Sequence, residues 1–143
     1  MKLSQTDQQL LTLLRENART STAQLARRMG VSRTTVQSRL ERLERDGVIS
    51  GYTVRVHDQH EHGHIRAHIM MAVHPKQQAS VVTALRAMPE VRSLHSVSGA
   101  YDLVAIALVP AVGDMDVLTD RIGALDGVDR TTSSIVLSTK FER

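Results

Sequence analysis

Residues 65–143 repeat one order of predicted elements, strand, helix and strand, and this repeat limits the possible folds more than any other feature. In both copies a proline follows the first strand, and the two prolines, Pro75 and Pro110, lie 35 residues apart. Two such units joined by a tight turn at 98–100 predict a ferredoxin-like β-α-β-β-α-β sandwich, an antiparallel sheet with both helices on one face. The predicted strands are 65–73, 91–97, 101–109 and 128–137, and the predicted helices are 77–88 and 114–125.

The first of these strands alternates between two kinds of face. Every second residue from Ile65 to Val73 is apolar, which predicts that this side packs against the helices. The other side begins with Arg66 and His68 but continues with Met70 and Ala72, so it is partly apolar as well. Because such a face needs a cover, and a second copy of the chain is the simplest one, we expect a homodimer.

The N-terminal residues predict three short helices, because apolar residues recur at helical spacing from Leu3 to Leu43. The first helix should end near residues 17–19. Ser21 and Gln24 form a capping box that starts the second helix, and Gly30 should end it. A third helix should follow from the N-cap Ser32 to Asp46-Gly47, with Val36, Leu40 and Leu43 as its buried stripe.

The second and third of these helices have the spacing of a helix-turn-helix. Ala26 supplies a small residue where the helices touch, Gly30 the turn, and Val36 an apolar residue facing back. An ordinary three-helix bundle is the alternative. The outward face of the third helix favours DNA binding, because it carries short hydrogen-bonding side chains and guanidiniums instead of Lys-Glu pairs. Residues 48–56 alternate and predict a hairpin with its turn or bulge at Gly51, which can act as a wing.

The residues expected to contact DNA belong to the third helix and to the helix before it. Gln, Ser and Thr side chains can read base edges, whereas Arg can read guanine or hold phosphates. The candidates are Ser32, Arg33, Thr34, Thr35, Gln37, Ser38, Arg39 and Arg42, with Arg27 and Arg28 for phosphates.

Charge is distributed unevenly along the chain. Residues 1–56 carry 10 basic and 5 acidic side chains, and residues 57–143 carry 8 and 10, which together give the net charge of +3. A basic half favours a polyanionic partner, and an ordinary solvated surface is the alternative. Two Tyr, one Phe and no Trp are too few for a single-strand stacking platform, so the expected polyanion is double-stranded DNA. The chain has no Cys, which excludes disulfides, and it has neither a signal-peptide pattern nor a long apolar run. We expect a cytoplasmic protein without membrane contact.

Residues 57–64 contain no apolar side chain and are predicted to be a His-rich linker. His60, His62 and His64 alternate, so an extended segment would place them on one side, where they can ligate zinc or nickel. A flexible linker supplies no fixed geometry, however. We therefore expect a solvated or pH-sensitive linker, no metal site and no cofactor.

Six segments in the correct order resemble the leucine-responsive regulator family, also called Lrp/AsnC. Gly47 to Tyr52 resembles the family's Gly-x-Ile-x-Gly-Tyr wing, and Val97 to Asp102 resembles its Ser/Thr-Gly-x-Tyr/Phe-Asp turn. The other four matching segments are 7–11, 18–21, 32–44 and 127–128. The resemblance implies a winged helix-turn-helix joined to a ferredoxin-like effector domain, dimers that assemble into octamers, and an amino acid bound at a cleft between dimers.

In the positions that match the family, Asp102 can hold the ammonium of an amino acid. Thr131 and Ser133 share one face of the last strand and can bind its carboxylate. A turn cap or a surface salt bridge is the alternative role of Asp102. The expected effector residues are Ser98, Gly99, Tyr101, Asp102, Thr131 and Ser133.

We therefore predict an α+β protein with a DNA-binding domain at 1–56, a linker at 57–64 and an effector-binding and oligomerisation domain at 65–143. Its predicted function is sequence-specific transcription regulation modulated by a small molecule, most simply an amino acid. A nucleoid-type architectural protein with little effector response is the alternative. We expect no enzyme, because no nucleophile with a base and an orienting group is recognisable.

Overall fold

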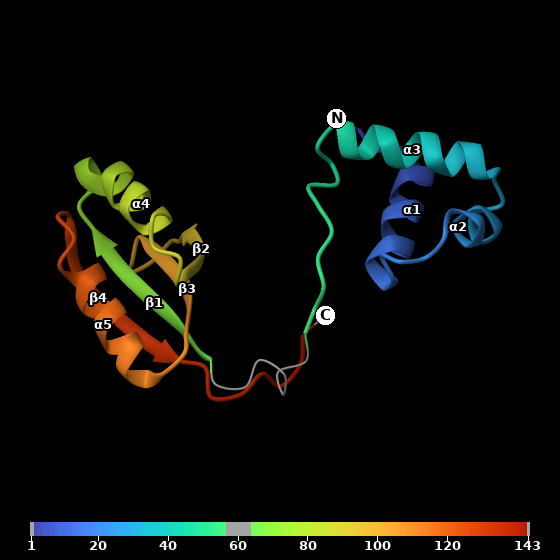
Figure 1. Ribbon diagram of the computed structural model, residues 1–143. Helices are drawn as coiled ribbons and strands as arrows, with labels where there is room; N and C mark the ends of the chain where they lie inside the picture. Colours follow the sequence, from blue (N-terminus) through green and yellow to red (C-terminus); the bar gives the residue numbers. More distant parts are fainter. Residues whose placement is uncertain (1, 57–63, 143) are drawn as a thin grey trace. The chain divides into compact units, whose positions relative to one another are not determined.

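A computed structural model of the protein describes residues 2–56 and 64–142. The chain divides into two compact units, Met1–Arg55 and Val56–Arg143, and each is considered by itself (Figure 1). Of the predicted His-rich linker, only His64 is among the described residues.

The N-terminal unit consists of three helices whose ends follow from their capping residues. Ser21 and Gln24 form the predicted capping box, and Gly30 ends the second helix with a left-handed φ of 66°. Ser32 caps the third helix as predicted, and Ser4 with Asp7 forms a further capping box that the sequence analysis missed. The helices are α1 (Gln5–Glu16), α2 (Thr22–Met29) and α3 (Arg33–Arg45).

Seven buried apolar residues hold these helices together. Val36 and Leu43 of α3 are fully buried, and Leu40 packs against the cluster while remaining partly exposed. The close approach of α2 to α3 therefore uses the residues that the helix-turn-helix spacing predicted. The cluster consists of Leu10, Leu13, Leu14, Leu25, Ala26, Val36 and Leu43.

The predicted hairpin over residues 48–56 is wrong, because this segment contains no strand. Gly51 does not adopt the positive φ that several two-residue hairpin turns require. A two-stranded hairpin is also marginal when nothing packs on it, and Val54 is 81% exposed. The segment is held instead at Tyr52, whose hydroxyl donates a 2.6 Å hydrogen bond to Glu44 of α3. This bond, together with burial and the charge of Glu44, raises the pKa of Tyr52 to about 12.

The C-terminal unit has the predicted ferredoxin-like order. Its four strands form one antiparallel sheet in the order β2-β3-β1-β4, in which β1 pairs with both β3 and β4. A short 3-10 turn, η1 (Pro75–Gln77), precedes the first helix. The elements are β1 (Ile65–Val73), α4 (Gln78–Arg86), β2 (Val91–Ser96), β3 (Leu103–Val109), α5 (Val112–Gly123) and β4 (Val128–Ile135).

Both helices pack on the face that the alternation predicted. Alternate residues of β1 from Ala67 to Val73 are buried with residues of α4 and α5 in one core of fourteen apolar side chains. On the opposite face of the sheet, Met70 and Val104 are partly buried and face each other, while His68 and His95 are exposed. This open face is the one expected to need a cover.

Seven boundaries in this unit differ from the predictions by one or two residues, including both ends of α4 and of α5 and the end of β2. Three of the differences have a clear local cause. The helix predicted from residue 77 begins one residue later, after the 3-10 turn that Pro75 starts. The third strand begins at Leu103, because Asp102 uses its side chain and backbone in the turn before it. The last strand, predicted to reach residue 137, ends at Ile135, since β1, its only partner in the described sheet, pairs with it no further than Ala67.

Candidate DNA-binding surface and effector cleft

The outward face of α3 presents the predicted base-reading side chains to solvent. Arg33, Thr34, Gln37 and Ser38 are all exposed. The Gln37 amide donates a 3.0 Å hydrogen bond to Glu41 one turn later, which directs its own carbonyl oxygen away from that partner. A Gln held in this way offers chiefly an acceptor to a base edge.

Ser32 and Thr35, two further predicted contacts, serve the start of α3. The Ser32 hydroxyl accepts a 3.1 Å hydrogen bond from the Thr35 backbone N–H and lies 2.8 Å from the Thr35 hydroxyl. Both side chains therefore fix where the helix begins. On α2, Arg27 and Arg28 are exposed, and Arg28 forms a 3.0 Å ion pair with Glu16.

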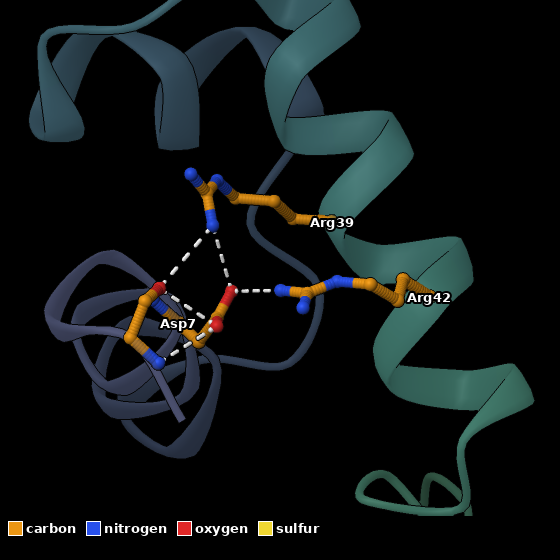
Figure 2. A network of polar contacts seen from close by, with 4 residues as sticks. Asp7, Arg39 and Arg42 are labelled. Atoms are coloured by element: carbon orange, nitrogen blue, oxygen red, sulfur yellow. Dashed lines mark hydrogen bonds and ion pairs between the residues drawn. The ribbon is translucent and has the colours of Figure 1, made fainter. Parts of the chain in front are cut away.

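Arg39 and Arg42 make contacts that the sequence analysis did not foresee. Figure 2 shows both guanidiniums reaching from α3 to the Asp7 carboxylate at the start of α1. The Oδ1 atom of Asp7 accepts hydrogen bonds from Arg39 Nη1 at 2.9 Å and from Arg42 Nη2 at 2.6 Å. Asp7 is only 1% exposed, whereas the arginines are 29% and 39% exposed. The two arginines therefore connect α3 to α1. The sequence analysis assigned them to DNA contacts alone and did not predict this structural role.

The second oxygen of Asp7 is also saturated. Oδ2 accepts hydrogen bonds from the Ser4 hydroxyl at 2.7 Å and from the Ser4 backbone N–H at 3.0 Å. Burial by itself raises the pKa of the Asp7 carboxyl, but the hydrogen bonds from Ser4, Arg42 and Arg39 outweigh it. The pKa therefore lies well below its ordinary value, and Asp7 is ionised at neutral pH. The Ser-x-x-Asp spacing of Ser4 and Asp7 is the sequence signal that could have placed this carboxylate.

Asp102 is positioned at the irregularity of β1. Its Oδ2 atom accepts a 2.8 Å hydrogen bond from the Val73 N–H, next to the register shift between Ala72 and Val73, and its own N–H donates to Met71. These contacts are those of a turn cap. The same carboxylate also lines an open cleft with a volume of about 480 Å³. The cleft is lined by Ala72, Val73, His74, Gln77, Asp102, Gly127, Val128 and Asp129.

The predicted effector residues do not all meet at this cleft. Thr131 and Ser133 pair with Met71 and Ile69, whose side chains are buried under the helices, so they share the helix-facing side of β4. Tyr101 instead lies 2.5 Å from the hydroxyl of Thr132, on the open face. Among the predicted six, which include Ser98 and Gly99 of the preceding turn, only Asp102 lines the cleft.

The sequence analysis did not predict three polar residues of the cleft. His74, Gln77 and Asp129 lie on separate elements and have no motif spacing, so only the fold brings them to Asp102. Gly127 packs so closely on Gln77 that a Cβ built at residue 127 would lie 2.4 Å from the Cβ of Gln77. The cleft therefore has one wall made of backbone.

Of the three alternating linker histidines, only His64 is among the described residues. His60 and His62 lie outside the described residues, and residues 2–56 and 64–142 contain no group of three His, Asp or Glu side chains placed to hold a metal ion. Within the same ranges, no helix is long and apolar enough to cross a membrane.

Two family descriptions match the chain. The Lrp/AsnC ligand binding domain matches residues 66–143, and a winged helix-turn-helix DNA-binding domain matches residues 3–50. The chain is 35% identical to the HTH-type transcriptional regulator LrpA1 of Halobacterium salinarum, over 90% of this chain and 91% of that protein.

Solved structures agree with these matches over almost the whole chain. The leucine response regulatory protein LrpA of Mycobacterium tuberculosis is 32% identical, with a TM-score of 0.84 and coverage of 98% of this chain and 96% of that one. The feast or famine regulatory protein Rv3291c of the same organism, complexed with L-methionine, is 31% identical, with a TM-score of 0.89 and coverage of 99% and 96%. The present chain belongs to the Lrp/AsnC family of transcriptional regulators.

Proposed function

We propose that the chain regulates transcription by inserting α3 into the major groove of specific double-stranded DNA sites, and that an amino acid bound to its C-terminal unit modulates this binding. The observation that carries the proposal is the outward face of α3. It presents Thr34, Gln37 and Ser38 to solvent, and the exposed acid beside them, Glu41, is paired with Gln37. The relatives are named as transcriptional regulators, which supports a role in regulation and not in catalysis.

The DNA-binding role can be tested on α3 directly. Replacing Gln37 or Ser38 with Ala should relax base preference by about 1–3 kcal/mol at one position of the site. Binding of each variant to a selected duplex and to random duplexes, measured over a range of salt concentrations, separates base reading from phosphate attraction. Equal affinities and equal salt slopes on both duplexes would favour the nucleoid-type alternative. A triple Ala variant at Thr34, Gln37 and Ser38 with unchanged affinity and preference would contradict the role of α3.

The effector proposal is based on the Asp102 cleft. Within the described residues, Oδ1 of Asp102 has no hydrogen-bond partner, so this carboxylate can bind the ammonium of an amino acid while Oδ2 caps Val73. L-Methionine complexes of Rv3291c and of NMB0573 from Neisseria meningitidis support an amino acid as the ligand class. Thr131 and Ser133 remain proposed carboxylate contacts, and Ser98, Gly99 and Tyr101 remain proposed neighbours of the ligand.

Asp102→Asn tests this site without removing the cap, because the amide oxygen can still accept the Val73 N–H. The loss of a charge-assisted contact should weaken binding of an L-amino acid by about 1.5–3 kcal/mol. Thermal unfolding of the full chain with each of the twenty amino acids measures this, since a ligand of the native state raises its stability. Asp126→Asn, an exposed neighbour outside the cleft, is the control. An unchanged response of Asp102→Asn would contradict the site.

We further propose that a second copy covers the open sheet face around Met70 and Val104, and that such dimers assemble into an octamer. The two side chains face each other across β1 and β3 and are only partly buried within one copy. Sedimentation of the full chain should detect at least a dimer at micromolar concentration. Val104→Asp should shift the population toward the monomer, because dimerisation would bury a charge. A wild-type monomer would contradict the proposal.

A further inference from the structure

A second cleft lies between the start of α1 and one flank of α3. It has a volume of about 540 Å³ and is open to solvent. Its lining combines cations and hydroxyl groups around the buried Asp7. The lining residues are Lys2, Ser4, Asp7, Thr34, Thr35, Ser38, Arg39 and Arg42.

The cleft is electropositive although it contains a carboxylate. Lys2, Arg39 and Arg42 contribute three positive charges against the single negative charge of Asp7, which leaves a net charge of +2. Both oxygens of Asp7 already accept two hydrogen bonds each, and the side chain is 1% exposed. An anion entering the cleft therefore meets guanidinium and hydroxyl groups, with the carboxylate shielded behind them.

Asp7 holds the two arginines in fixed positions without using up their donors. A guanidinium has five N–H donors, and the bond to Asp7 engages one terminal nitrogen of Arg39 and one of Arg42. Both side chains remain partly exposed at the cleft. Because a pre-oriented guanidinium loses less freedom when it binds an anion, the geometry favours bidentate recognition of phosphate.

The place of the cleft on α3 indicates which phosphate it receives. Thr35, Arg39 and Arg42 are spaced by four and three residues, so they form the flank of α3 next to α1, whereas Thr34 and Ser38 belong to the outward face. A helix with side chains is about 10–12 Å across and the major groove is about 12 Å wide, so the flanks of an inserted helix lie against the sugar-phosphate strands.

We propose that this cleft binds one phosphodiester of the DNA backbone and that Asp7 is a positioning residue for it. The inference rests on the proposed insertion of α3 into the major groove. Arg39 and Arg42 hold the nonbridging oxygens and Lys2 adds charge, while Thr34 and Ser38 at the edge of the cleft keep their place on the outward face that reads bases. An open cleft suits a continuous DNA strand better than a free anion, which would stay largely exposed to water there.

The test uses the full chain and a short duplex selected by the wild-type protein from a random pool. In a set of such duplexes, one backbone phosphate at a time is replaced by a neutral methylphosphonate, and the affinity for each is measured. The wild type should lose affinity at a few positions. For Arg42→Gln, the loss of affinity caused by the methylphosphonate should disappear at one of these positions and persist at the others. The slope of log affinity against log salt concentration should fall in magnitude by about 0.9.

Two further variants keep the test decisive if Arg42→Gln unfolds. Lys2→Gln touches no hydrogen bond of Asp7 and should reduce the loss at the same phosphate. Asp7→Asn should reduce it as well, although it raises the net charge of the cleft to +3, because the neutral amide no longer holds the arginines in place. Arg15→Gln removes an equal charge from an exposed position of α1 outside the cleft and should preserve every loss.

If Arg42→Gln, Lys2→Gln and Asp7→Asn all keep the wild-type loss at every phosphate, the phosphate cleft is wrong. The proposed function then stands, provided that the wild type still prefers the selected duplex. If the wild type selects no duplex at all, both the proposed function and the phosphate cleft are wrong.

Discussion

The N-terminal unit buries seven apolar residues and one carboxylate, whereas the C-terminal unit buries fourteen apolar residues and, among those described, no charged side chain. A small core gains little from hydrophobic burial alone. The N-terminal unit adds the hydrogen-bonded network of Asp7, which also fixes α3, the helix proposed to face DNA. The larger core of the C-terminal unit is sufficient without such a network and leaves one sheet face available for a partner. The N-terminal unit therefore supplements its apolar core with a buried charge network, whereas the described part of the C-terminal unit depends on apolar packing.

Matched cavity mutations, one in each core, should cause the largest loss of stability. Leu43→Ala in the N-terminal core and Leu118→Ala in the C-terminal core each remove a side chain that is at most 1% exposed. Each should cost about 2–5 kcal/mol. Hydrogen exchange of backbone amides in the full chain should show lost protection in the mutated unit alone. Lost protection in both units after either substitution would show that they do not unfold independently.

Asp7→Asn should have an intermediate effect, a loss of about 1–3 kcal/mol confined to the N-terminal unit. Asn keeps the size and one acceptor oxygen but loses the charge that both arginines and Ser4 stabilise. Hydrogen exchange in α1 and α3 measures the loss. Asp46→Asn is the matched control, because its 3.6 Å pair with the exposed Arg45 should contribute close to nothing.

The pH dependence of stability provides an independent check on Asp7. Its folded pKa lies below the ordinary value of 3.8, so its contribution is complete above that value and is lost as the pH falls toward the folded pKa. Protection of the wild-type N-terminal unit should therefore fall below about pH 4. The fall should be smaller in Asp7→Asn, which has no carboxyl to protonate there. An equal fall in both proteins would contradict the role given to this carboxylate.

Arg121→Ala should have the smallest effect, less than about 1 kcal/mol. The 3.0 Å pair of Arg121 with Glu90 is 47% and 32% exposed, so solvent screens it. The backbone N–H of Glu90 is the main cause that lowers the pKa of its carboxyl, and this contact survives the substitution. Thermal unfolding of the full chain is a sufficient measurement. A loss as large as that of Asp7→Asn would mean that charge stabilises both units alike.

Local patterns in the sequence were enough to predict most of the fold. The alternation of β1 gave its bounds, Ile65–Val73, because a strand with one buried face specifies its own register. The Ser21 capping box and Gly30 placed α2 for a similar reason. The prediction of a hairpin at 48–56 was wrong, because alternation of side chains does not indicate whether a neighbouring strand is present to pair with.

The candidate sites were less predictable, because their residues come together only through tertiary packing. Asp7 is flanked by the polar residues Thr6 and Gln8, so the sequence alone suggests an exposed position for it, yet Arg39 and Arg42 from more than thirty residues away cover it. His74, Gln77 and Asp129 join Asp102 in the same way. The exposed face of α3 was predictable, since one helical period defines it.

Gly127 restricts the substitutions that this protein can accept, both in evolution and in a designed library. Its φ of 97° and its contact with Gln77 leave no room for a side chain. A library randomised at this codon should return only glycine among folded variants. New preferences at the proposed ligand cleft must therefore arise at residues such as His74 or Asp129, while this backbone wall is inherited unchanged.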